Sequence, residues 1–333
     1  MGTLWLLVAA CASQPATVVR GPADEGDELD RPTRPTTVED PDDTTEDTGT
    51  PPSDTGPGTT ETGLPEDTGT PADTGESSLQ ACYPGSALDW TVCMPLVQPA
   101  LDSDYDYPPM LDGDPQYREP VAWLDLAVED PGTAIAPNFV LEEIAQEWKG
   151  RYAVVLPGAI QRLQDVRDDL GALIINSGYR NPAYNASVGG VEYSRHQYGD
   201  AFDIDPVSVG LSTLADSCYD HDAGYVGVYE THIHCDWRND TVDEAFYGVP
   251  PTGMAPGTAG LPVHDAQLVL EGSWWTAPAS GWDEGEPLRE WVALDEAGGV
   301  LAQQTGRRFA APEHTATVRV TVGRAVVRTA VLP

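Results

Sequence analysis

The chain has 333 residues, and its 17 Lys and Arg against 54 Asp and Glu give a formal net charge of −37. So acidic a chain is a poor partner for nucleic acid, because phosphate binding needs patches of Lys and Arg. The length allows two folded units with linkers. No apolar stretch approaches the roughly 20 residues that a membrane-spanning helix needs. We expect a monomer.

Residues 1–11 are predicted to be a lipoprotein-type signal segment. Val8-Ala9-Ala10-Cys11 resembles the lipobox of bacterial lipoproteins, in which the cysteine is lipidated and becomes the mature N-terminus. The apolar run lacks the Lys or Arg of an export signal, so either the true start lies upstream of Met1 or the segment is trimmed. The resemblance implies a secreted cell-envelope protein, anchored in a membrane through Cys11 and facing the periplasm or the exterior.

Residues 12–80 consist largely of Asp, Glu, Thr, Pro and Gly, with the near-repeats DTGTPPSDTG and EDTGTPADTG. Such a segment buries too little apolar area to offset its chain entropy. The sequence therefore predicts a long disordered tether, extended by prolines and by repulsion among carboxylates.

Four cysteines follow Cys11, namely Cys82, Cys93, Cys218 and Cys235. An even set is typical of an oxidising compartment. We favour Cys82 with Cys93 and Cys218 with Cys235, although the sequence leaves three pairings open. Residues 81–130 are read as a loop-rich pre-domain, whose aromatic side chains are expected to pack against the following domain in preference to stacking on sugars.

Three elements are predicted before the candidate site. Apolar side chains recur at helical spacing in 138–148 and again in 157–170, where Gly171 provides the C-terminal cap. Residues 172–176 (ALIIN) read as a buried strand. Residues 213–223 read as a polar loop, and His221 within it is assigned to the surface in preference to a fourth ligand role.

Histidines and acidic side chains gather between 174 and 236. The run AFDID alternates in period two, so Asp203 and Asp205 point one way and the apolar residues point to the core. The run THIHCDW places His232, His234 and Asp236 on one face in the same way. With His196 nearby, these side chains are the ligand types that zinc prefers, and two neighbouring strands would form the floor of a metal site.

Three blocks in this stretch carry a family resemblance: SGYRNPAYN, SRHQYGDAFDID and HIHCD. Together they resemble the zinc D-Ala-D-Ala carboxypeptidase and murein endopeptidase family, part of a wider group with lysostaphin-type peptidases and the hedgehog domain. The resemblance implies a domain at 131–250 of α+β class, with helices packed on a small antiparallel sheet. It also implies zinc on His196, Asp203 and His234, and a substrate-binding role for Arg180.

The proton-handling group is less clear from the sequence. Several relatives place a glutamate three residues before the last histidine, where this chain has Thr231. Glu230 would share the ligand face if its strand were regular, and His232 stands beside the metal in H-x-H members of the family. We favour His232 and then Glu230 as the catalytic group, with Ser194 and Asp205 as the residues that orient His196 and the sheet.

Residues 261–333 contain short alternating or apolar runs between turns, which predict a small all-β sandwich that serves as an accessory module. The whole chain is then interpreted as a zinc metallopeptidase that hydrolyses D-amino-acid-containing bonds of peptidoglycan stem peptides through a metal-activated water. It would act as a D-Ala-D-Ala carboxypeptidase or a murein endopeptidase. The alternative is a catalytically inactive, zinc-containing lipoprotein that binds the cell wall or another surface ligand.

Overall fold

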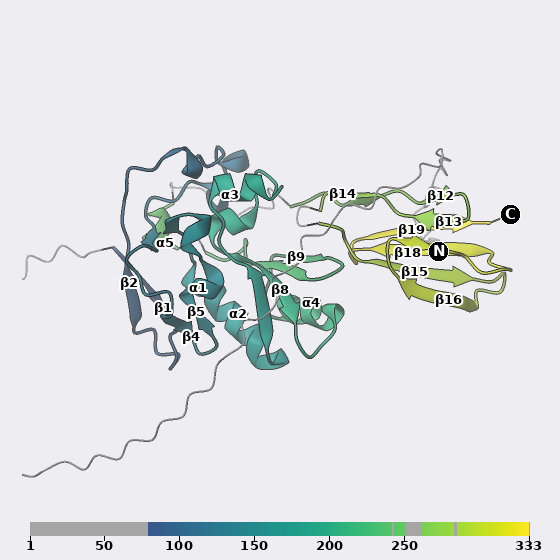
Figure 1. The fold of residues 1–333 in the computed structure, drawn as a ribbon, viewed down its shortest axis with the longest axis horizontal. Coiled ribbons are helices and arrows are strands. Elements are labelled where there is room, and N and C mark those ends of the chain that lie inside the picture. The colour runs from purple at the N-terminus through teal and green to yellow at the C-terminus, as the bar shows by residue number, and fades with distance from the viewer. Residues whose placement is uncertain (1–78, 242, 251–260, 283–284, 333) are drawn as a thin grey trace, which may run out of the picture. The chain divides into compact units, whose positions relative to one another are not determined.

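A computed structural model describes residues 79–241, 243–250, 261–282 and 285–332. The predicted signal segment and lipidation site at Cys11 lie outside the described residues, as does nearly all of the predicted tether. What is described combines helices with small antiparallel sheets (Figure 1). Among these residues no helix has both the length and the apolar character to cross a membrane.

The central sheet has the strand order β7-β8-β10-β9. Its strands are β7 (Leu173–Ser177), β8 (Ala201–Pro206), β9 (Tyr225–Val228) and β10 (Ile233–Asp236), and all neighbours are antiparallel. Strand β7 is therefore an edge strand with alternate residues partly exposed, and the prediction of a buried strand there was wrong.

Two helices accompany this sheet. Helix α2 (Pro157–Leu170) begins with proline at its first position and ends at Gly171, whose φ of 84° suits glycine. Helix α4 (Leu211–Asp220) packs on β9 and β10 (Figure 1). The sequence predicted α2 correctly but gave a loop in place of α4, since Ser, Thr and Asp dominate that segment and its apolar face is short.

The predicted helix over 138–148 is broken into smaller pieces. Strand β5 (Phe139–Val140) pairs with β4 (Ala134–Ala136), α1 (Leu141–Ile144) follows, and the 3-10 turn η4 (Glu147–Lys149) completes the segment. The predicted helix does not form as one element, because the first residues of the segment pair with β4 in a hairpin. As a result Trp148, expected on the buried face, is 71% exposed.

The pre-domain residues share one hydrophobic core with the central sheet. The core joins Tyr83 and Trp123 to Leu163 and Phe202, and the Tyr107 hydroxyl lies 2.9 Å from that of Tyr179. This is the packing role that the sequence favoured for these aromatic side chains. The preceding strands are β1 (Gln80–Tyr83), β2 (Val92–Pro95), β3 (Leu124–Asp125) and β6 (Tyr152–Ala153), and the remaining helical segments are η1 (Ser103–Tyr105), η2 (Leu111–Gly113), η3 (Pro115–Tyr117), α3 (Pro182–Ser187), η5 (Arg195–Tyr198) and α5 (Glu244–Tyr247).

After residue 260 the described chain is all strand and turn. One sheet has the order β16-β15-β18-β19 and another the order β12-β13-β17, and a second core around Trp275, Trp291 and Phe309 includes residues of both. The strands are β11 (Asp265–Ala266), β12 (Val269–Glu271), β13 (Trp274–Thr276), β14 (Ala279–Ser280), β15 (Arg289–Leu294), β16 (Val300–Thr305), β17 (Arg308–Phe309), β18 (Thr317–Val322) and β19 (Val326–Val331).

Candidate metal centre

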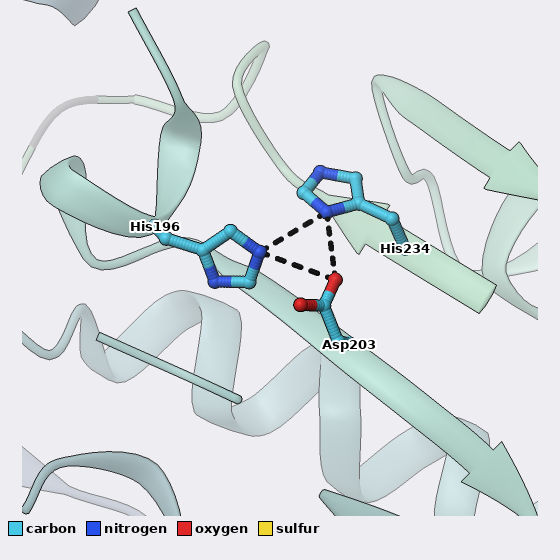
Figure 2. Close-up of side chains that lie close together, drawn as sticks. All are labelled: His196, Asp203 and His234. Carbon is cyan, nitrogen blue, oxygen red and sulfur yellow. Dashed lines mark hydrogen bonds and ion pairs between the residues drawn. The ribbon is translucent and has the colours of Figure 1, made fainter. Parts of the chain in front are cut away.

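Three side chains from separate elements meet at one point above the central sheet. Figure 2 shows His196 from η5, Asp203 from β8 and His234 from β10 converging. His234 and Asp203 are direct partners in the β10–β8 register. Because side chains alternate across a strand, Phe202 and Ile204 then lie in the core, where both are buried.

The turn between His196 and Asp203 depends on glycine. Gly199 has a φ of 80°, in the left-handed region, and a Cβ there would meet the Val154 carbonyl oxygen at 2.4 Å. The same turn is held by Arg195, which is buried against the rings of Tyr117 and Tyr198 and donates to Asp200. These contacts fix where His196 stands before the strand begins.

The donor atoms of the three side chains are spaced as a metal requires. His196 Nε2 lies 3.2 Å from Asp203 Oδ1 and 3.1 Å from His234 Nδ1, and His234 Nδ1 lies 3.1 Å from Asp203 Oδ1. A tetrahedral zinc site with ligands at about 2.0 Å has edges of about 3.3 Å. All three residues are buried, and two imidazoles with one carboxylate form a donor set that suits zinc. The residues present therefore fit the ion.

Each imidazole has a partner on its other nitrogen. His196 Nδ1 donates to the Gly178 carbonyl oxygen at 2.6 Å, and His234 Nε2 donates to Asp236 Oδ2 at 3.2 Å. Asp236 in turn accepts from Arg238 Nε at 2.7 Å. These bonds leave His196 Nε2 and His234 Nδ1 directed at the common point, which is the usual arrangement around a ligating histidine.

The orienting residues differ from those expected. Ser194 Oγ and Asp205 Oδ1 are both buried and make no hydrogen bond among the described residues, so the expected support of His196 by Ser194 and of the sheet by Asp205 is not seen. Gly178 and Asp236 hold the imidazoles. A backbone carbonyl leaves no mark in a sequence. The alternation in HIHCD did place Asp236 on the face of His234, but no orienting role was assigned to it.

Charge within the cluster is strongly shifted. Burial opposes ionisation of Asp203, but His196 and His234 outweigh it and hold the pKa of the carboxyl well below its usual range. Burial likewise lowers the pKa of His234, whereas its hydrogen bonds to Asp203 and Asp236 hold the pKa of the imidazole well above its usual value. In the metal-free protein the ionised Asp203 carboxylate therefore pairs with the protonated His234 imidazole. Binding of a metal ion to that imidazole would release its proton.

Arg180 lies in the same cleft as Asp203 and is buried. Its Nε donates to Ser177 Oγ at 2.8 Å, and one terminal nitrogen pairs with Asp203 Oδ2. Since Oδ2 is taken by the guanidinium, Asp203 presents Oδ1 to the imidazoles. The structure thus places Arg180, for which the resemblance implies substrate binding, beside the cluster, where it pairs with the Asp203 carboxylate.

Of the two candidate proton-handling residues, Glu230 lies at the tip of a hairpin turn and His232 directly follows that turn. The Tyr229 amide donates to the His232 carbonyl at 3.0 Å, so Glu230 and Thr231 form the tip between β9 and β10. The expected orientation of Glu230 required a regular strand, and Glu230 does not lie on one. Its carboxylate accepts from Arg307 Nε at 3.1 Å. His232 stacks on Tyr229, with its Nε2 3.9 Å from Asp203 Oδ1.

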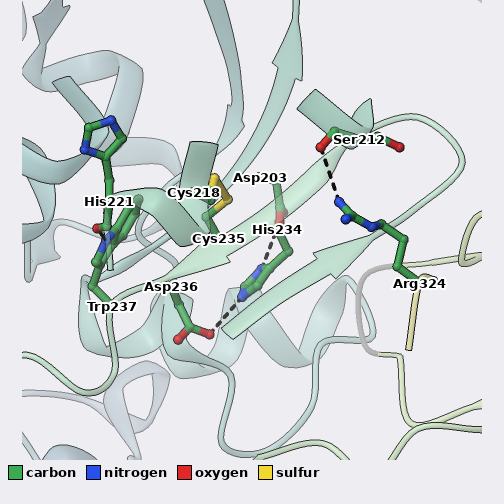
Figure 3. The surroundings of a disulfide bond; sticks show 9 residues. All are labelled: Asp203, Ser212, Cys218, His221, His234, Cys235, Asp236, Trp237 and Arg324. Carbon is green, nitrogen blue, oxygen red and sulfur yellow. Dashed lines mark hydrogen bonds and ion pairs between the residues drawn. A yellow bond between two sulfur atoms is a disulfide. The ribbon is translucent and has the colours of Figure 1, made fainter. Parts of the chain in front are cut away.

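The remaining predicted site residues are the cysteines and His221. Disulfides join Cys82 to Cys93 and Cys218 to Cys235, the pairing that the sequence favoured. The second bond ties α4 to β10 directly beside His234 (Figure 3). His221 lies away from the cluster, with its Nε2 2.7 Å from Asp169 Oδ2.

Comparison with known proteins agrees with this geometry. Residues 137–236 match the family described as Peptidase M15, and the matched segment contains His196, Asp203 and His234. A relative, the zinc D-Ala-D-Ala carboxypeptidase of Streptomyces albus G, is 27% identical over 122 residues, which are 36% of this chain and 37% of the relative. The match thus spans little more than a third of the relative's length. Together these likenesses support a peptidase role.

Proposed function

We propose that this protein is a zinc metallopeptidase that hydrolyses D-amino-acid-containing peptide bonds of bacterial peptidoglycan. The observation that carries the proposal is the buried cluster of His196, Asp203 and His234, whose donor atoms are spaced as a tetrahedral site needs. The family match and the name of the relative support the chemistry and the substrate class.

Zinc held by these three residues would act as a Lewis acid, lowering the pKa of water toward about 7 and polarising a carbonyl. The chain itself must then move protons. His232 Nε2 is the proposed site, because it lies 3.9 Å from a ligand atom and its ring is held against Tyr229. It would take a proton from the attacking water and return one to the leaving amine. Arg180 would hold Asp203 and bind the substrate oxygen that gains charge.

Digestion of defined muropeptides, followed by mass spectrometry of the products, tests this proposal. We expect the zinc-loaded protein to release products, and a chelator or His196→Ala to abolish release. His221→Gln is the matched control, because it removes a histidine outside the cluster. Absence of any product from zinc-replete protein would reject the peptidase.

A non-catalytic, zinc-containing binder of wall peptides is the second candidate. The observation that favours it is the position of Glu230, whose carboxylate pairs with Arg307 and Arg289 and so is engaged outside the cluster. His232→Ala separates the two candidates. A catalytic role for His232 predicts loss of turnover by about 10²–10⁴-fold with zinc still bound, whereas a binder would show no turnover to lose.

We further propose that the protein is a monomer anchored at the cell envelope by lipid on Cys11, with the folded part exposed to the periplasm or the exterior. The lipobox-like run before Cys11 and the acidic segment after it support this. One acyl chain holds a protein only weakly, so stable anchoring needs more than one. Metabolic labelling with a radioactive fatty acid should mark the protein, and a Cys11→Ala form that still carries label would contradict the assignment.

A further inference from the structure

The chain contains a single lysine, Lys149, against 16 arginines. It ends η4, directly after the exposed Trp148, and lines the same cleft as Arg180 and Asp203. Despite its charge, Lys149 is only 6% exposed. A buried lysine beside a metal cluster needs a chemical reason, because an ammonium group that leaves water without an anionic partner is destabilising.

No carboxylate within the described residues forms an ion pair with Lys149. Its Nζ donates a long bond of 3.4 Å to Ser177 Oγ and lies over the rings of Trp148 and Tyr184, at 5.3 and 5.6 Å from their centres. Burial, followed by the nearby charge of Arg180, lowers the pKa of Lys149 to about 8. The nearby negative charge of Asp203 acts in the opposite direction but is the weakest of the three effects. The amine is therefore in contact with aromatic rings and a hydroxyl group, and not with a carboxylate.

The position of Lys149 relative to the metal ligands is given by a short relay of contacts. Asp203 pairs with Arg180, Arg180 donates to Ser177 Oγ, and Lys149 donates to the same oxygen. Lys149 thus lies one side-chain layer further from the ligands than Arg180. Consecutive residues of a peptide substrate are about 3.8 Å apart. In a substrate that is cut at its last peptide bond, the group one residue beyond the scissile carbonyl is therefore the terminal carboxylate.

We propose that Lys149 binds the free C-terminal carboxylate of the substrate, beside the contacting rings of Trp148 and Tyr184. This inference rests on the proposed peptidase function and deepens it, because it selects carboxypeptidase over endopeptidase action. The bound carboxylate supplies the direct ion-pair partner that Lys149 does not find among the described residues.

Paired substrates test the assignment. A peptide ending in D-Ala-D-Ala with a free carboxylate is compared with the same peptide as a C-terminal amide, using wild type, Lys149→Met and Lys149→Arg. We expect wild type to prefer the acid. Lys149→Met should lose about 10- to 100-fold in kcat/KM on the acid and little on the amide, because a hydrogen bond between charged groups is removed. Lys149→Arg should recover part of the loss.

Arg151→Met is the matched control. Arg151 is a cation two residues away whose guanidinium pairs with Asp125, and the variant should keep the wild-type preference for the acid. Equal losses on acid and amide in Lys149→Met would overturn the proposal, since they would indicate a purely structural role. An unchanged preference in that variant would overturn it as well.

A binding measurement keeps this inference separate from the proposed function. Reductive ¹³C-methylation keeps the positive charge and labels one lysine besides the N-terminal amine. The lysine NMR signal of the zinc-loaded protein should shift on addition of the acid peptide and stay in place with the amide. If wild type cleaves neither peptide but the signal still shifts with the acid alone, the peptidase proposal fails and the carboxylate site stands. A signal that ignores the acid rejects the site.

Discussion

Each imidazole in the metal cluster has its second nitrogen bound to a group that fixes its tautomer. For His196 the group is a backbone carbonyl, and for His234 it is Asp236, itself held by Arg238. A backbone acceptor cannot be removed by substituting a side chain, whereas the carboxylate can. The support of His234 is therefore the part of the site most open to mutation.

Asp236→Asn should weaken zinc binding by about 10- to 100-fold. The amide oxygen still accepts from His234 but carries no charge, and Arg238 loses its ion pair. Competition with a chromophoric chelator gives the affinity. Asp205→Asn serves as the comparison, since Asp205 lies on the neighbouring strand and contacts no ligand. Equal affinities for the Asp236 variant and wild type would show that the ring is held without the carboxylate.

Lys149 should also affect how stability varies with pH. Its folded-state pKa, about 8, lies below the ordinary value of 10.5. Between these pH values the unfolded chain binds a proton that the folded protein does not, so the free energy of unfolding rises with pH across that window. Lys149→Met should be more stable than wild type below pH 8, and the difference should shrink toward pH 10.5. Urea denaturation at several pH values measures it, and a constant difference would contradict the shift.

Among the elements, β8 and β10 were the most predictable from the sequence. Their period-two alternation placed Phe202 and Ile204 in the core and Asp203 and His234 on the opposite face, as the structure shows. The hairpin tip at Glu230 and Thr231 was not predictable, because the turn contains none of the glycine, asparagine or proline that usually marks one. This unpredicted turn is the reason that Glu230 does not lie on the strand face with His234.

Other elements escaped prediction for related reasons. Helix α4 has a sequence rich in turn-forming residues, and its stability comes from packing on β9 and β10 and from the Cys218–Cys235 bond. Trp148 fits a helical period by spacing alone, while the actual chain breaks before it. Long-range contacts such as that of Lys149 with Ser177 leave no local pattern. His196, Asp203 and His234 were named together because two separate blocks, SRHQYGDAFDID and HIHCD, resemble those of one family. Most of the groups that contact these three residues carry no such signal.

Removing the disulfide between α4 and β10 should affect both stability and metal binding. Closing a loop of this length contributes about 3 kcal/mol, and Cys235 adjoins His234 on its strand. Cys218→Ala with Cys235→Ala should therefore lower the free energy of unfolding by about that amount and weaken zinc binding. Replacement of Cys82 and Cys93 is the control, with a comparable loss of stability and unchanged zinc affinity. Equal effects on zinc affinity from both pairs would contradict the local role.

On the scale of the whole molecule, the ion is expected to contribute to stability. A ligand present at 100 times its dissociation constant stabilises the folded state by about 2.7 kcal/mol, which for a domain of this size corresponds to a Tm change on the order of 5–10 °C. Chelation should lower the Tm of zinc-loaded protein by that much and leave His234→Ala unaffected. A chelator-induced shift of the same size in the variant would place the ion elsewhere.

The register of β8 and β10 has a consequence for the order of events in folding. Asp203 and His234 are 31 residues apart in the chain and become neighbours only when their strands join. The three side chains therefore come together only after β8 has paired with β10, and the bound ion cannot direct that pairing. Zinc should accordingly slow the unfolding rate while leaving the refolding rate nearly untouched. The loaded protein would then survive longer than its empty form in the presence of proteases without folding any faster.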